Sequence, residues 1–273
     1  MLPRPGDLFK AWILPLTFVV GLLSTGAPDG RSVVRAVLVW LVLELLIYQA
    51  RYQWNDIRGF HADLAHPDAS SRGRLPGPAH RARAHVRASR LVMGARLATA
   101  ACLALALRTL DVGRPLLLLA VAVFGAAFAY EWLRSTACGR TDRVPPPVRP
   151  GLLAIWIVIG AGYAIRGATG LLLALHDPSL AVIVTAALTM WAFGIAFVTA
   201  RWTLEALAFA RTADDGLAWE VRSQQAREHT LALVRWLPAG PPQDRAGGPV
   251  PPQRWPALAG VTAWQAPWNL AIL

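Results

Sequence analysis

The stretch that decides the fold reads VVRAVLVWLVLELLIYQARYQ over residues 33–53, followed directly by WNDIRGFHADLAHPDASSRGR over residues 54–74. The first part is apolar and long enough to enter a bilayer, because a spanning helix needs about 20 mostly apolar residues. The second part brings an Asn-Asp pair, a further Asp seven residues later and then several arginines. The stretch therefore predicts a membrane helix that ends in a polar site.

The composition agrees with a membrane protein. The 273 residues are 55% hydrophobic and only 16% charged, whereas soluble domains have nearer a quarter charged residues. The net charge of +11 comes almost entirely from arginine, since Lys10 is the single lysine. In a soluble protein such a charge would suggest nucleic acid, but here the arginines alternate with apolar runs. We therefore expect membrane topology and no nucleic-acid partner. Cys102 and Cys138 fit no metal or disulfide spacing.

Six apolar stretches predict membrane helices, and a seventh is interrupted by prolines. The predicted fold class is all-α, a multi-pass bundle of six to seven spans, with residues 1–236 as the bundle and 237–273 as a proline-rich linker and one Trp-rich helix. The predicted spans are Ala11–Thr25, Val33–Ala50, Leu91–Thr109, Pro115–Leu133, Leu152–Leu175, Leu180–Ala200 and, last, Trp255–Leu273.

The arginine distribution predicts the orientation. With a cytoplasmic N-terminus, the inside segments hold 21 Lys or Arg residues and the outside loops hold 4, which fits the positive-inside rule. This orientation places both long polar loops, residues 51–90 and 201–254, on the cytoplasmic side. We expect a multi-pass protein of the cell membrane.

The first polar loop has the pattern of a metal site. If the helix continues past the apolar run, Asn55, Gly59 and Asp63 share one face and Asp56 lies beside them, until Pro67 ends the helix. Asn and Asp oxygens are hard ligands suited to Mg²⁺, which completes its shell with substrate phosphates. The arginines that follow would hold further phosphate oxygens. The same residues also fit a solvated, arginine-rich loop whose acids balance charge.

The segment IYQARYQWNDIRGFHADLAHP, residues 47–67, resembles the first signature of the UbiA family of intramembrane prenyltransferases, Asn-Asp-x-x-Asp-x-x-x-Asp. Its residue pattern most resembles that of the branch that transfers phosphoribose onto decaprenyl phosphate. Asn55, Asp56 and Asp63 match, whereas Gly59 replaces the central Asp. His66, seven residues after Gly59, falls on the helical face where it would partly compensate. The resemblance implies a helical bundle around a lipid-accessible cavity, with Mg²⁺ and a diphosphate at the motif.

Two later segments extend the resemblance. FAYEWLRS, residues 128–135, is similar to the Tyr-x-x-x-Lys/Arg end of the family's fourth helix and brings in Arg134. IVIGAGYAIRGATGLLLA, residues 157–174, is similar to the fifth helix and contains Arg166. An arginine inside a spanning helix costs about 2.5–3.5 kcal/mol on insertion scales, so Arg166 needs a polar cavity, an anionic substrate or a carboxylate. Glu44 is the candidate carboxylate, and a structural ion pair or snorkelling is the alternative to substrate binding.

The family's second acidic signature corresponds to residues 193–223, where the usual Asp-x-x-x-Asp is absent. Asp214 and Asp215, and Glu205 less directly, are the acids placed to supply it. The sequence ADDG also fits a plain turn, and Glu205 also fits an ion pair with Arg201 one turn earlier.

Together these features suggest an Mg²⁺-dependent membrane prenyltransferase, which transfers a polyprenyl group from its diphosphate, or phosphoribose from phosphoribosyl diphosphate. A membrane terpene cyclase and a non-catalytic bundle of the same type are the alternatives. Donor length, acceptor and oligomeric state are left open. The expected catalytic residues are Asp56, Asp63, Asp214 and Asp215; the expected metal ligands are Asn55, Asp56, Asp63 and Asp215; the expected substrate-binding residues are Asn55, Arg72, Arg74, Arg134 and Arg166.

Overall fold

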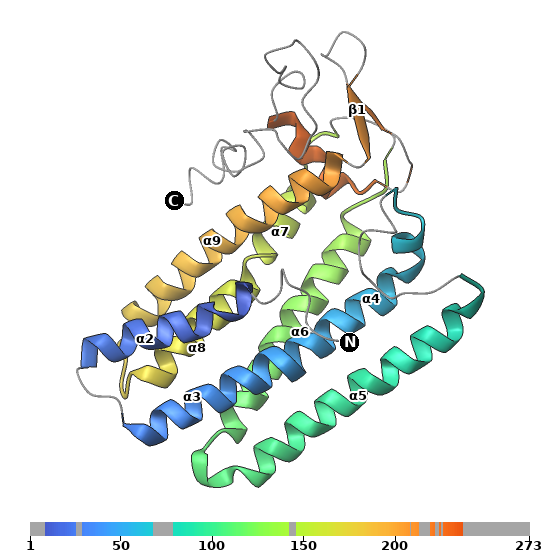
Figure 1. The fold of residues 1–273 in the computed structure, drawn as a ribbon. Coiled ribbons are helices and arrows are strands. Elements are labelled where there is room, and N and C mark those ends of the chain that lie inside the picture. Colours follow the sequence, from blue (N-terminus) through green and yellow to red (C-terminus); the bar gives the residue numbers. More distant parts are fainter. Residues whose placement is uncertain are drawn as a thin grey trace, which may run out of the picture. The chain divides into compact units, whose positions relative to one another are not determined.

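The computed structural model describes residues 9–25, 29–67, 79–141, 146–207, 209–212, 219–221, 224 and 226–236. Almost all of them are helical (Figure 1). The main elements are α2 (Ile13–Thr25), α3 (Gly30–Val42), η1 (Leu43–Ile47), α4 (Tyr48–Leu64), α5 (Ala82–Ala106), α6 (Gly113–Thr136), α7 (Pro150–Val158), α8 (Ala161–Ala174), α9 (Leu180–Leu207), β1 (Ala210–Thr212), β2 (Trp219–Val221) and α10 (Glu228–Leu231). Short 3₁₀ turns are η2 (Ala79–Arg81), η3 (Arg108–Leu110) and η4 (Ala232–Trp236).

Five helices among the described residues are long and apolar enough to cross a membrane. They run over Gly30–Leu64, Ala82–Ala106, Gly113–Thr136, Pro150–Ala174 and Leu180–Thr203. A sixth apolar helix, Phe9–Ser24, is shorter. The expected multi-pass helical bundle is thus confirmed in its class, while the predicted seventh span lies outside the described residues.

Three details differ from the predicted helices. The second span is much longer than expected, because α3, η1 and α4 form 35 continuous helical residues with a π-helical turn at η1. The fifth predicted span is broken at Ile159 and Gly160, where α7 ends and α8 begins. A short antiparallel pair, β1 and β2, adds strands to a chain expected to be all-α.

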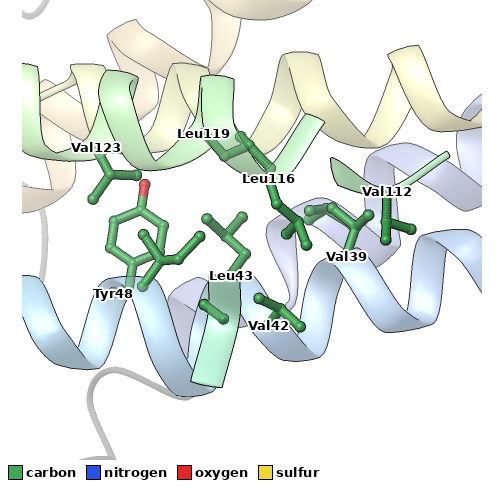
Figure 2. Packing of buried hydrophobic residues seen from close by; sticks show 11 residues of the cluster. Val39, Val42, Leu43, Tyr48, Val112, Leu116, Leu119 and Val123 are labelled. Atoms are coloured by element: carbon green, nitrogen blue, oxygen red, sulfur yellow. The ribbon is translucent and has the colours of Figure 1, made fainter. Parts of the chain in front are cut away.

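The chain divides into two compact units. The first contains residues 1–64, 72–128 and 161–191, and the second contains 65–71, 129–160 and 192–273. Within the first unit α2 lies beside α8, and α5 lies beside α4 (Figure 1). The core of this unit is apolar: Figure 2 shows Val39, Leu43 and Tyr48 directed towards Leu116 and Val123 of α6.

Helix starts follow from local chemistry. The side chain of Asp29 caps α3 by accepting the backbone N–H of Arg31 at 3.2 Å. Pro150 occupies the first turn of α7, where a missing N–H costs nothing. These residues define where two of the membrane-length helices begin.

Small residues bring α8 close to its neighbours in the first unit. In a bilayer, helices associate through close packing because lipid is as apolar as the side chains. A Cβ added to Gly170 would lie 2.4 Å from the backbone oxygen of Leu14 and 2.0 Å from Oγ1 of Thr17, both in α2. Gly170 therefore permits the contact between α2 and α8.

Gly170→Ala is expected to lower the free energy of unfolding in detergent by about 3 kcal/mol, because the backbone of α2 must move away from the new methyl group. Gly94→Ala is the matched control, since nothing lies within 4 Å of an added Cβ there. That control should stabilise slightly, because glycine is less favourable than alanine within a helix. Equal effects of the two substitutions would contradict the packing role of Gly170.

Candidate functional site

The first acidic motif lies on α4, as the sequence predicted. The helix runs unbroken from the apolar segment to Leu64 and carries Asn55, Asp56 and Asp63. Asp56 is buried, with 7% of its surface exposed, and the other two are half-buried. Burying a carboxylate costs free energy unless it has polar or charged partners. Asp56 and Asp63 both have such interactions.

Gly59 and Asp63 share one face of α4. A Cβ built on Gly59 would lie 3.3 Å from Oδ2 of Asp63, so the carboxylate reaches back over the preceding turn. This contact confirms the predicted spacing of one helical turn. His66 does not extend the face, because α4 ends at Leu64 and the imidazole packs edge-on against Phe209 at 4.5 Å. The expected position of His66 on this helical face is therefore wrong, while its partial compensation for the missing Asp stays a prediction.

Arg166 is bound by Glu44 inside the first unit. The guanidinium donates through Nε to Oε1 of Glu44 at 2.6 Å and through Nη2 to Oε2 at 2.8 Å. Nη1 donates to the carbonyl of Gly162 at 3.1 Å. Arg166 is only 1% exposed, and its guanidinium carbon lies 3.4 Å from the centre of the Tyr48 ring. The sequence named Glu44 as the candidate partner, and the structure shows that pair. A role of Arg166 in substrate binding stays a prediction.

Two irregularities of the backbone accompany this pair. Glu44 lies in the π-helical turn η1, and Gly162 lies just after the break between α7 and α8. The carbonyl of Gly162 also accepts the hydroxyl of Tyr48 at 3.0 Å. π-helical turns inside α-helices are frequent at functional sites, because they re-aim side chains within a continuous helix.

Several polar side chains are buried along η1 and α4, between the ion pair and the acidic motif. Glu44, Tyr48, Gln53 and Asp56 are all buried, at successive intervals of three to five residues. Gln53 accepts a hydrogen bond from Arg96 of α5 at 2.5 Å. An interval of five residues, as between Tyr48 and Gln53, turns a helix by about 140°, so these side chains do not form one face. Polar groups are therefore buried on more than one side of this helix within the first unit.

The remaining predicted site residues are only partly described. Arg134, in the last turn of α6 and part of the second unit, pairs with Glu131 at 2.5 Å and lies 5.7 Å from the Tyr130 ring. Its role towards substrate stays a prediction. Arg72, Arg74, Asp214 and Asp215 lie outside the described residues, whereas Glu205, the less direct candidate for the second acidic set, lies half-buried in α9.

The donor chemistry of the α4 motif fits magnesium. Asp56 and Asp63 supply carboxylates and Asn55 supplies a carboxamide, and Mg²⁺ takes one or two carboxylates together with water and substrate phosphates. Within the described part of the chain no group of three His, Cys, Asp or Glu side chains gathers to hold an ion. The motif alone therefore offers two carboxylates and one carboxamide, and a metal site there stays a prediction.

A second polar cluster, which the sequence did not suggest, lies in the second unit. Sγ of Cys138 lies 2.9 Å from Nδ1 of His229, and both side chains are buried. Trp156 donates its indole N–H to the His229 carbonyl at 2.8 Å. Next to them Glu228 accepts the backbone N–H of Gly139 at 2.8 Å. These contacts fasten the segment after α6 to the segment that contains α10. No local pattern announces the pair, because Cys138 and His229 are 91 positions apart.

The cluster holds His229 neutral. Burial, with the nearby positive charges of Arg134 and Arg227, lowers the pKa of His229 to about 3. Burial also raises the pKa of the Cys138 thiol. A neutral thiol therefore meets a neutral imidazole.

Acid is expected to destabilise the second unit through His229. The pKa of this histidine is about 6.5 in the unfolded chain and about 3 in the folded protein. Between these pH values the unfolded chain binds one more proton than the folded protein. The free energy of unfolding therefore falls as the pH falls below about 6.5. At pH 4 the loss is about 3 kcal/mol. In His229→Gln, the free energy of unfolding measured by thermal unfolding should fall about 3 kcal/mol less between pH 6.5 and pH 4 than it does in the wild type. An unchanged slope would show that His229 does not carry the effect.

Comparison of the chain with protein-family models, with curated proteins and with solved structures gave no match. The likeness to the UbiA family accordingly rests on the motifs of α4, α6 and α8, and functional proposals for this chain rest on its own residues.

Proposed function

We propose that this protein is an Mg²⁺-dependent membrane transferase that acts on an isoprenoid diphosphate or on phosphoribosyl diphosphate. The observation that supports it is the continuation of a membrane-length helix into a partly buried acidic motif. The 35 residues from Gly30 to Leu64 exceed the roughly 20 needed to span a bilayer. Asn55, Asp56 and Asp63 are thereby fixed on a rigid element near a membrane surface.

In this proposal the α4 motif binds the charged end of the donor. Asn55, Asp56 and Asp63 hold the metal, and Asp214 and Asp215 supply the second acidic set. When bound, Mg²⁺ neutralises charge on the departing diphosphate. Arg72, Arg74 and Arg134 bind the phosphate oxygens, because guanidinium groups match their geometry.

The chemistry follows from the donor. The bond between carbon and the diphosphate oxygen breaks, and its electron pair leaves with the diphosphate. The acceptor forms the new bond to that carbon; a carbon or hydroxyl acceptor then loses a proton, whereas an anionic phosphate oxygen has none to lose. With a polyprenyl diphosphate the acceptor is a nucleophile within the bilayer, and with phosphoribosyl diphosphate it is a polyprenyl phosphate.

A non-catalytic bundle is the second candidate, and Gly59 favours it. Because Gly59 replaces the central Asp of the motif, α4 carries two carboxylates, Asp56 and Asp63, where the resemblance implies three. Such a protein would keep the fold and bind no diphosphate in a metal-dependent manner.

The test is binding followed by product analysis with the purified protein. Membrane-reconstituted protein is incubated with radiolabelled isoprenoid diphosphates of several lengths and with phosphoribosyl diphosphate, with Mg²⁺ or with a chelator. Mg²⁺-dependent binding and a product that requires an acceptor are expected. A product formed without an acceptor would identify a cyclase, and no Mg²⁺-dependent binding of any donor would favour the non-catalytic bundle.

Gly59→Asp is expected to raise the affinity for Mg²⁺ about tenfold, because it adds a third carboxylate one turn from Asp63. The added Cβ lies 3.3 Å from Oδ2 of Asp63, so that side chain must shift slightly. Gly94→Asp adds the same charge where nothing lies within 4 Å and is the matched control. Calorimetric titration with Mg²⁺ measures both variants. An equal affinity in both would show that the motif does not bind the metal.

A further inference from the structure

The first half of α5 carries an exposed row of arginines. Arg83, Arg87 and Arg90, here called the α5 arginine stripe, are spaced by four and three residues and are all exposed. Side chains at these intervals lie on one face of a helix. The stripe extends about 10 Å along the axis, at about 1.5 Å per residue.

Among the residues that the structure describes, the stripe has no ion-pair partner. The 25 residues of α5 contain no aspartate or glutamate. Within the described part of the chain, none of the three arginines forms an ion pair. Arg96 differs, because its guanidinium is turned to Gln53 of α4. The three exposed guanidinium groups therefore offer unused donors to a ligand.

The stripe meets the apolar part of the helix at a sharp boundary. Leu91, directly after Arg90, is 69% exposed, and Leu105 near the other end of α5 is also 69% exposed. Of the most apolar 18-residue window of α5, only 11% is buried. Large apolar side chains exposed along a membrane-length helix lie against acyl chains. The adjoining arginines then fall within the headgroup layer, which adds roughly 5–8 Å on each side of the hydrocarbon core.

We infer that the α5 arginine stripe is a binding site for the phosphate headgroups of anionic phospholipids. Guanidinium groups form paired hydrogen bonds with phosphate oxygens. Each arginine near a membrane surface contributes about 1 kcal/mol towards anionic lipid, which corresponds to roughly fivefold in affinity. A lipid fits better than a nucleic acid, because the same helix face carries the exposed Leu105, about five turns beyond Arg87. The site is independent of the proposed transferase activity.

Native mass spectrometry of the full-length protein in detergent tests the inference by counting bound phosphatidylglycerol and phosphatidylcholine. Wild type is expected to prefer phosphatidylglycerol. The double variant Arg87→Gln/Arg90→Gln should bind it roughly 25-fold more weakly, at about fivefold per arginine. Arg108→Gln/Arg114→Gln removes the same charge from exposed positions in η3 and at the start of α6, outside the stripe, and should weaken binding clearly less than the stripe variant does.

Two further arms remain informative if the double variant folds poorly. Arg87→Lys/Arg90→Lys keeps the charge and should retain most of the preference. Raising the salt from about 0.1 M to about 1 M should remove it in the wild type, because ionic screening shortens to about 3 Å. Equal losses in the two glutamine variants would overturn the site in favour of net charge alone. A lipid preference that salt does not affect would also overturn the site. The same holds if the glutamine substitutions weaken binding of single-stranded RNA and leave lipid binding unchanged.

Discussion

Glu44→Leu is expected to lower the free energy of unfolding by about 3–5 kcal/mol, because it leaves the guanidinium of Arg166 buried without its carboxylate. The pair is bidentate, at 2.6 and 2.8 Å, and Arg166 is 1% exposed. A buried charge keeps its desolvation cost when its partner is removed, and water does not reach it. Unfolding in mixed detergent micelles, followed by circular dichroism, measures the loss.

The double variant Glu44→Leu/Arg166→Met should recover most of that stability, since it removes both charges and leaves apolar side chains of similar size. Arg31→Met is the matched control for an exposed pair: Arg31 and Asp111 lie 3.4 Å apart at 60% and 77% side-chain exposure. Its cost should stay below about 1 kcal/mol. A double variant as unstable as Glu44→Leu would show that the buried pair does not stabilise through its charges.

Asp56→Asn is expected to reduce Mg²⁺-dependent turnover at least about 100-fold, because charge stabilisation by a bound metal is worth several kcal/mol at the transition state. The amide matches the carboxylate in size and removes its charge. Asp56 is the most buried of the three motif residues on α4, so a change of shape there is avoided. Turnover of radiolabelled donor in membranes measures the effect.

Asp177→Asn controls for the loss of one carboxylate, since Asp177 is exposed in the segment between α8 and α9. It should leave turnover unchanged, and both variants should remain folded in the membrane. Full turnover in Asp56→Asn would remove Asp56 from the metal site, whereas loss of folding in that variant would show a structural role.

The predictions from sequence succeeded where a local rule applies. Apolar length identified the spanning helices, and helical periodicity placed Gly59 and Asp63 on one face of α4. The cost of a charge inside a membrane led from Arg166 to Glu44, even though they are 122 positions apart. These inferences needed no knowledge of packing, since each follows from what a bilayer or a helix demands of single residues.

Other features depend on contacts between distant segments. The π-helical turn at η1 and the break between α7 and α8 adjust the backbone where Glu44, Tyr48 and Gly162 meet. His66 does not lie on the predicted helical face, because α4 ends at Leu64. The pairing of Cys138 with His229 had no spacing to signal it.

The amino-acid sequence by itself determined that this protein is a bundle of membrane-length helices with acidic residues at the end of one of them. Hydropathy and helical periodicity depend on residues that are close in the sequence, so both can be predicted without a tertiary structure. Only the tertiary structure decided which polar groups are buried and matched, such as Cys138 with His229, and which stay open to a ligand, such as the α5 arginine stripe. The physical reason is that burial and pairing depend on which segments pack together, and desolvation then sets the cost of every charge they enclose.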